Sequence, residues 1–308
     1  MPDLSEGIVT KTAGSTYWVW MQNQFYCCTL AGKVRLEGIK ATNPVAVGDK
    51  VVFDAEKKTI IDILPRKNYI LREAANLSRR IQILAANLDL LALIVSYKLP
   101  RTSKGFADRV LATCEAYSVS PLIIFNKHDL WDQEDQTAVE EWKQVYESLG
   151  YRTLISSIYN EISIQELSKH LIGKTTLFIG HSGAGKSSLL NKLIPGLGLR
   201  TADISRKFGK GRHTTTFAEM FITEQFRVID TPGVKEFGMA RMKKAEVGDY
   251  FPEILKIKHL CRYNNCLHVN EPGCAVLEAV KEGKIATWRY ENYLNILHSC
   301  QYEAWRDE

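Results

Sequence analysis

The sequence predicts a multidomain chain: an N-terminal OB-type β-barrel, a central α/β domain, and a C-terminal, mainly α domain. In the first part of the chain, polar residues alternate with β-branched or aromatic ones in short stretches. Continuous apolar runs separated by amphipathic stretches follow. The last part is charged and aromatic, and it contains a cluster of Cys and His residues. We place the domains at residues 1–68, 69–240 and 241–308.

Five short segments of the N-terminal region have the composition of strands, and glycines between them mark bends. They are Gly7–Thr10, Tyr17–Met21, Phe25–Thr29, Lys33–Glu37 and Val51–Asp54. A small closed barrel is the simplest arrangement that leaves such strands without free edges. An OB-type barrel fits and commonly binds oligonucleotides, whereas an SH3-like barrel that contacts proteins is the alternative.

Four apolar runs of the central region are continuous enough for strands that are buried on both faces. They are Leu90–Val95, Pro121–Phe125, Thr175–Ile179 and Phe226–Ile229. Amphipathic segments between them, at Phe106–Ser118 and Ala138–Leu149, predict helices. The central region is therefore predicted to be a parallel sheet covered by helices. In the C-terminal region we expect helices near Ala245–Ile257 and Ala286–Trp305.

Three motifs of a GTP site occur in rotated order. Asn126-Lys-His-Asp129 comes first, a phosphate loop at 180–187 second, and Asp230-Thr-Pro-Gly233 last. In an ordinary P-loop GTPase the phosphate loop comes first and the Asn-Lys-x-Asp motif lies near the end. The order predicts a circularly permuted GTPase. Permutation preserves such a site because its loops all lie at the carboxyl ends of parallel strands, and domain termini often lie close together.

The phosphate loop follows a predicted strand and precedes a predicted helix, which is the context that gives this motif meaning. Its glycines let successive backbone N–H groups point at phosphate oxygens near a helix N-terminus. Lys186 is predicted to neutralise the β- and γ-phosphates, and Ser187 to ligate Mg²⁺. The predicted GTP-binding residues of this loop are Gly180, His181, Ser182, Gly183, Ala184, Gly185, Lys186, Ser187 and Ser188.

The base is predicted to be guanine, read by Asn126, Lys127 and Asp129. The Asp129 carboxylate accepts hydrogen bonds from guanine N1–H and its 2-amino group, whereas adenine would leave the carboxylate unpaired. Ser156 and Ser157 follow a strand-like segment and are expected to bring a backbone N–H near guanine O6.

The remaining magnesium and γ-phosphate contacts are predicted at Asp230 and Gly233 and in a threonine triplet. Asp230 ends a predicted strand and is expected to hold the magnesium shell, while the Gly233 N–H reaches the γ-phosphate. Among Thr214, Thr215 and Thr216 we favour Thr215 as the switch residue that completes the magnesium shell.

The predicted catalytic residues are His213, Lys186 and Thr215. Many GTPases place a glutamine after Asp-x-x-Gly to orient water, but Val234 occupies that position here and cannot do so. His213 is the candidate to orient or polarise the water instead, because a neutral imidazole is available near pH 7. Slow intrinsic hydrolysis that a partner accelerates is the expected behaviour.

The cluster Cys261-x₄-Cys266-x-His268-x₅-Cys274 supplies three thiolates and one imidazole. This set suits a closed tetrahedral zinc site, which holds a fold because no position is left for water. Buried free thiols are the alternative interpretation. A structural metal is physically sensible in so small a region, which would bury little core alone.

Together these motifs resemble the ribosome small-subunit-dependent GTPase A family, and the resemblance covers nearly the whole chain. The segments Gly211–Thr216 and Asp230–Gly238 add to it. The family often has Asp-Ser-Pro-Gly where this chain has Asp230-Thr-Pro-Gly. The resemblance implies a late assembly factor of the small (30S) ribosomal subunit, whose GTP hydrolysis the subunit stimulates and couples to release. It also implies that the barrel and zinc domain contact ribosomal RNA, and that His213 is catalytic.

The composition of the chain indicates where the protein is located and what it binds. No apolar run is long enough for a membrane helix, and the N-terminus lacks the features of a secretion signal. We therefore expect a cytoplasmic monomer without membrane contact. The net charge is +5, and basic residues gather at 66–80 and 200–212, where they would attract polyanions. A GTP-sensing RNA-binding scaffold with little turnover, or a GTPase of large-subunit assembly, remains the alternative.

Overall fold

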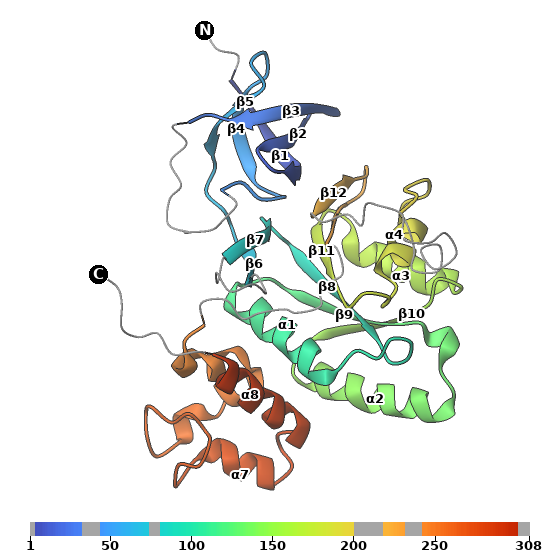
Figure 1. Ribbon diagram of the computed structural model, residues 1–308. Helices are drawn as coiled ribbons and strands as arrows, with labels where there is room; N and C mark the ends of the chain where they lie inside the picture. The colour runs from blue at the N-terminus through green and yellow to red at the C-terminus, as the bar shows by residue number, and fades with distance from the viewer. Residues whose placement is uncertain (1–3, 33–43, 74–80, 200–217, 232–241, 301–308) are drawn as a thin grey trace.

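The computed structural model describes residues 4–32, 44–73, 81–199, 218–231 and 242–300. Figure 1 shows the barrel in blue at one end, the α/β domain in the middle, and the orange to red C-terminal region packed beside α1 (Lys104–Ala116). None of the helices in these ranges combines the length and apolar character needed to cross a bilayer.

The N-terminal region is a closed five-stranded barrel, as predicted. Its strands run in the order β1-β2-β3-β5-β4, and β1 also pairs with β4, which closes the barrel. The predicted strand Lys33–Glu37 lies outside the described residues, and the fifth strand is β5, which the sequence analysis did not identify. The bounds are β1 Leu4–Ala13, β2 Thr16–Met21, β3 Gln24–Leu30, β4 Lys50–Asp54 and β5 Thr59–Ile63.

The α/β domain contains a parallel sheet in the order β10-β9-β8-β11-β13, with β12 antiparallel beside β13. Strand β12 also pairs with β1 at Lys11 and Glu219, so the barrel and this sheet form one continuous sheet. The strands are β8 Leu90–Ser96, β9 Pro121–Asn126, β10 Arg152–Ser156, β11 Thr175–Ile179, β12 Glu219–Ile222 and β13 Arg227–Asp230.

Helices cover both faces of this sheet. Along β8, Leu91 and Leu93 belong to the core beneath α1 and α2 (Gln133–Ser148), whereas Ala92 and Ile94 face α3 (Glu161–Leu171) and α4 (Lys186–Leu193). Each strand residue is thus buried whichever way it points, which explains the continuous apolar runs. The hairpin of β6 (Tyr69–Glu73) and β7 (Ile81–Ala86) precedes β8 and was not predicted from the sequence.

The C-terminal region contains α7 (Ala275–Lys281) and α8 (Thr287–Ser299) after a series of short turns. The prediction of one helix near Ala245–Ile257 is wrong. A 3₁₀ helix, η2, spans Lys244–Tyr250, and a separate single turn, α6, begins at Pro252 and ends at Leu255. Proline lacks a backbone N–H and has a fixed φ, so it is tolerated in the first turn of a helix and breaks a helix interior.

Candidate functional site

The predicted nucleotide loops converge on one edge of the parallel sheet. Asn126 at the end of β9 lies opposite Ser96 of β8 on one side and opposite Ser156 of β10 on the other. On the other half of the sheet, Phe178 of β11 pairs with Asp230 of β13. The base-reading segments, the phosphate loop after β11 and Asp230 therefore all lie at the carboxyl ends of neighbouring strands, where open α/β sheets bind ligands.

The phosphate loop is packed so closely that side chains would not fit at two of its glycines. A Cβ at Gly180 would lie 2.7 Å from the Ile94 carbonyl oxygen. Gly185, the N-cap of α4, has a φ of 102°, in the left-handed region that L side chains avoid. The two glycines therefore let the backbone of the loop pack closely against its neighbours. Helix α4 begins directly after the loop, at Lys186.

The ammonium of Lys186 is held inside this loop. Its Nζ donates hydrogen bonds to the carbonyl oxygens of Gly180 at 2.6 Å and His181 at 3.2 Å, and the residue is only 6% exposed. Burial lowers the pKa of Lys186, and the nearby Asp230 carboxylate opposes that effect. The two carbonyl oxygens take the place of water around the Lys186 ammonium and stabilise its positive charge at the base of the loop.

Asp230 is the acid that faces this cation. Burial raises the pKa of its carboxyl to about 6, although Lys186 acts in the opposite direction. Its Oδ1 is buried and accepts no hydrogen bond from the described residues. The following Thr231 is buried, and its hydroxyl donates to the Phe178 carbonyl at 3.1 Å. A buried carboxylate oxygen without a protein donor has the chemistry to bind a divalent cation such as Mg²⁺.

Asp129 is exposed, and one of its carboxylate oxygens accepts a hydrogen bond from the loop that follows β10. Ser157 Oγ donates to Asp129 Oδ1 at 2.5 Å, and the Tyr159 N–H donates to Ser157 Oγ at 3.2 Å. The Ser157 N–H itself donates to Ser163 Oγ at 3.2 Å. The side chain of Ser157 thus orients the carboxylate that is predicted to read the base, while the Ser157 N–H is occupied by Ser163. Ser163 was not among the predicted residues; it lies in the first turn of α3, where its N–H donates to the N-cap side chain of Asn160.

The other predicted nucleotide residues fall into two groups. Lys127 has a φ of 67° and directs its Nζ to the Leu99 carbonyl, while Ser182 is exposed and Ser187 and Ser188 lie in the first turn of α4. The second group, His213, Thr214, Thr215, Thr216 and Gly233, lies outside the described residues.

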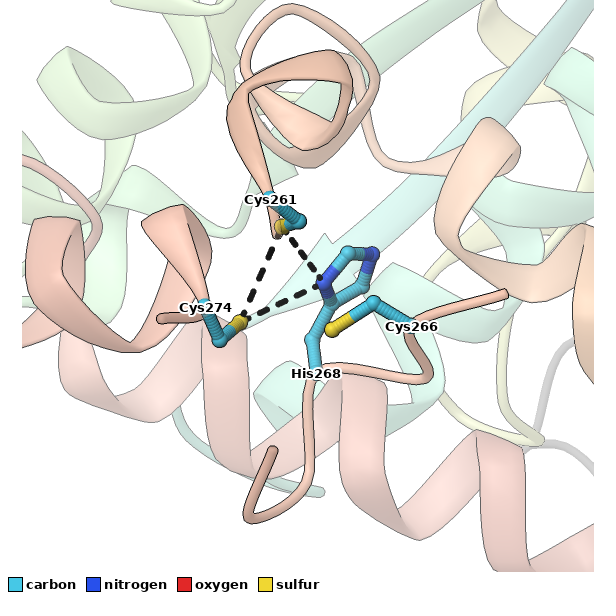
Figure 2. A group of neighbouring side chains, drawn as sticks. All are labelled: Cys261, Cys266, His268 and Cys274. Carbon is cyan, nitrogen blue, oxygen red and sulfur yellow. Dashed lines mark hydrogen bonds between the residues drawn. The ribbon is translucent and has the colours of Figure 1, made fainter. Parts of the chain in front are cut away.

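The predicted metal ligands come together in the C-terminal region. Figure 2 shows Cys261, Cys266, His268 and Cys274 pointing toward one common point, and their ligand atoms all lie within 4.8 Å of one another. Cys261 Sγ and Cys274 Sγ are 3.9 Å apart, and each lies 3.5 Å from His268 Nδ1. Tetrahedral zinc with ordinary bond lengths would need edges of about 3.8 Å between sulfurs and about 3.6 Å between sulfur and nitrogen. The donor set therefore fits zinc.

Neighbouring groups hold the ligand loop in this shape. The Glu271 carboxylate accepts hydrogen bonds from the backbone N–H groups of Leu267, Val269 and Asn270. From α8, Tyr290 Oη donates to the His268 carbonyl at 2.7 Å, and Tyr293 Oη donates to the Leu267 carbonyl at 2.6 Å. His268 is buried with a φ of 58°, and the loop and α8 together hold its backbone in place.

Comparison with known proteins agrees with this architecture. A family model described as RsgA GTPase matches residues 63–240, and one described as RsgA N-terminal domain matches residues 6–60. A small ribosomal subunit biogenesis GTPase RsgA from Christiangramia forsetii is 44% identical over 300 residues, which cover 95% of each chain. The protein of the same name from Bacteroides fragilis is 45% identical and covers 98% of this chain and 99% of its own.

Solved structures show the same fold. The crystal structure of YjeQ from Thermotoga maritima superposes with a TM-score of 0.76 at 33% identity, covering 96% of this chain and 98% of that one. The structure of YloQ, described as a circularly permuted GTPase, gives a TM-score of 0.69 at 28% identity and covers 96% and 94%. The rotated motif order is thus shared with a solved permuted GTPase.

Proposed function

This chain belongs to the RsgA GTPase family, and we propose that it is a late assembly factor of the small ribosomal subunit. It is a GTPase that uses GTP and Mg²⁺. In the proposed role, the subunit stimulates hydrolysis, and hydrolysis is coupled to release of the factor. The observation that carries this proposal is the convergence of the Asn126, Lys186 and Asp230 segments on one sheet edge, in a chain that resembles its named relatives almost from end to end.

In the proposed nucleotide site, the loop from Gly180 to Ser188 binds the phosphates. Lys186 neutralises their charge, and Asp230, Ser187 and Thr215 contribute to the magnesium shell, where the ion offsets the charge that develops on the phosphates. Asp129 reads the guanine edge. Because the Ser157 N–H is occupied by Ser163, we assign the contact to guanine O6 to the next amide, that of Ile158, which has no hydrogen-bond partner among the described residues.

The proposed catalytic step depends on residues that lie outside the described ranges. His213 is proposed to orient the attacking water, since Val234 replaces the glutamine that many GTPases use. The hydroxyl of Thr215 is proposed to complete the magnesium shell only when the γ-phosphate is present.

The Cys₃His cluster is proposed to hold one structural zinc ion, and the barrel and C-terminal domain are proposed to contact ribosomal RNA. We keep the proposed domain limits at 1–68, 69–240 and 241–308. We propose that the protein acts as a monomer. A role in assembling ribosomal subunits would place the protein in the cytoplasm, without membrane contact.

The proposal is tested by GTP turnover with and without purified small subunits, with large subunits as control. We expect strong stimulation by the small subunit alone, and its loss in Lys186→Ala, because the phosphates then lack their main cation. Lys169→Ala, which removes an exposed lysine from α3, should turn over GTP as the unmodified protein does. Nucleotide-dependent binding to the subunit without any change in turnover would contradict the enzyme role and favour a scaffold.

A further inference from the structure

Helix α1 contacts the phosphate loop through its first turn. The ring of Phe106 lies 3.9 Å from the ring of His181, measured between centroids, with 35° between the planes. His181 is the residue whose backbone carbonyl accepts a hydrogen bond from Lys186 Nζ. A displacement of Phe106 would therefore move a carbonyl that holds the phosphate-binding ammonium.

The same helix is held by the C-terminal domain two residues further along, at Asp108. Asp108 Oδ1 accepts hydrogen bonds from Arg289 Nη1 at 2.5 Å and from Tyr146 Oη at 2.7 Å. Asp108 Oδ2 accepts one from Asn292 Nδ2 at 2.6 Å. Asp108 is 0% exposed and Arg289 is 1% exposed, so this ion pair between α1 and α8 is entirely buried.

Arg289 is anchored on its other side as well. Its Nε and Nη2 donate to the two carboxylate oxygens of Glu253 in α6, at 2.7 and 3.0 Å, and its guanidinium lies 4.6 Å from the Phe251 ring centroid. A buried charge is tolerated only when its partners are in place, so this arrangement fixes the position of α8 against α1. Lys104 adds a second contact, since its ammonium lies 4.4 Å from the Trp288 ring centroid.

Phe106 and Asp108 are two positions apart and so point to different sides of α1. One side meets the phosphate loop and the other meets α8. A helix turn is stiff, so a shift that α8 imposes on Asp108 must also move Phe106.

We propose that the C-terminal domain positions the phosphate loop through α1. Arg289 and Asn292 hold Asp108, Phe106 holds His181, and the His181 carbonyl helps to hold Lys186. The inference rests on the proposed role of this loop in GTP binding. It makes Arg289, Asn292 and His181 positioning residues for GTP, although Arg289 and Asn292 lie in the C-terminal domain.

The test is the affinity of the full-length protein for fluorescent GDP and GTP analogues after Asn292→Ala. Asn292 is half-buried, so this variant removes one partner of Asp108 and keeps the Arg289 pair. We expect nucleotide affinity to fall by about fivefold to tenfold, at the lower end of coupling between distant sites. The matched control is Asn295→Ala, an exposed asparagine on the same helix, which should bind as the unmodified protein does.

A double-mutant cycle separates positioning from general loss of stability. In a His181→Ala background, Asn292→Ala should cause no further loss, because the contact that carries the effect is already absent. Zinc content and melting temperature verify that each variant is folded. If Asn292→Ala proves unfolded, Asn292→Leu keeps a similar side-chain volume, removes the donor without adding a charge beside Asp108 and should weaken affinity in the same way.

Unchanged affinity in the folded Asn292 variant, or losses that simply add to those of His181→Ala, would overturn the inference. Failure of the unmodified protein to bind GTP would instead contradict the proposed nucleotide site, so the two failures are distinguishable.

Discussion

The side-chain amide of Asn126 donates a hydrogen bond to the backbone carbonyl of Ala184 at 3.0 Å. This bond joins the segment that is predicted to read the base to the predicted phosphate loop across 58 positions of sequence, and both residues are buried. Asn126 therefore braces the two halves of the nucleotide site against each other. The approach is so close that a Cβ at Gly185 would lie 2.2 Å from Asn126 Nδ2.

Replacing Gly185 should disrupt this brace. Gly185→Ala forces a methyl group into Asn126 and adds the cost of a left-handed backbone, about 1–2 kcal/mol. We expect affinity for fluorescent GDP to fall at least tenfold, as roughly 1.4 kcal/mol or more would produce. Gly196→Ala is the control, because Gly196 also has a positive φ of 82° but a Cβ there would meet nothing within 4 Å. Equal affinities in the two variants would argue against the brace.

Asp129 should set the choice of base. Asp129→Asn replaces an acceptor by an amide that can donate to the 2-oxygen of xanthine, so affinity should move from GTP toward xanthosine triphosphate. Loss of hydrogen bonds to this charged acceptor, worth about 1.5–3 kcal/mol, predicts roughly 10-fold to 150-fold weaker GTP binding. Ser157→Ala should weaken GTP binding less, because it removes only the hydroxyl that orients Asp129. Competition assays with both nucleotides measure this, and an unchanged preference would refute the assignment.

The stability of the protein without nucleotide or added Mg²⁺ should depend on Asp230. Burial raises the pKa of this carboxyl from 3.8 to about 6. The fold therefore favours the neutral acid. The neutral acid therefore stabilises the fold fully below about pH 3.8, and this stabilisation is lost as pH rises through about 6. The pKa difference between the folded and unfolded states corresponds to roughly 3 kcal/mol of free energy of unfolding.

Asp230→Asn should therefore gain free energy of unfolding relative to the unmodified protein between pH 4.5 and pH 8. Urea unfolding at several pH values measures the difference. Asp62→Asn, which changes an exposed residue in the barrel, should give curves parallel to those of the unmodified protein. If the free energy of unfolding of Asp230→Asn also followed that of the unmodified protein at every pH, burial would not perturb the pKa of the Asp230 carboxyl.

Removing one ligand of the Cys₃His cluster should release the metal. The unmodified protein is expected to contain one zinc ion per chain by elemental analysis, and Cys266→Ser should lose it together with the folding of the C-terminal region. Cys300→Ser is the matched control, because Cys300 is buried in the same hydrophobic core but lies outside the cluster. Full zinc content in Cys266→Ser would exclude this ligand set.

Local patterns explain why much of the fold could be predicted. The parallel strands could be predicted because residues buried on both faces are mostly apolar, as from Leu90 to Val95 of β8. Strand β5 was missed because Asp62 interrupts its apolar character. In β6, Arg72 and Glu73 interrupt the apolar character in the same way. The interrupted helix near Phe251 and Pro252 shows the limit of periodicity, since proline changed the local backbone within an otherwise helical pattern.

The sequence by itself determined the GTPase motifs, their rotated order and the Cys₃His set that is predicted to bind zinc. These motifs can be recognised from residue type and spacing alone, because binding a phosphate, a base or a metal requires particular side chains at particular positions. Only the tertiary structure decided that Asn126 holds Ala184, that Ser157 orients Asp129, and that Arg289 is buried against Asp108. These contacts join residues far apart in the chain, and their free energies depend on burial and geometry that no local pattern encodes.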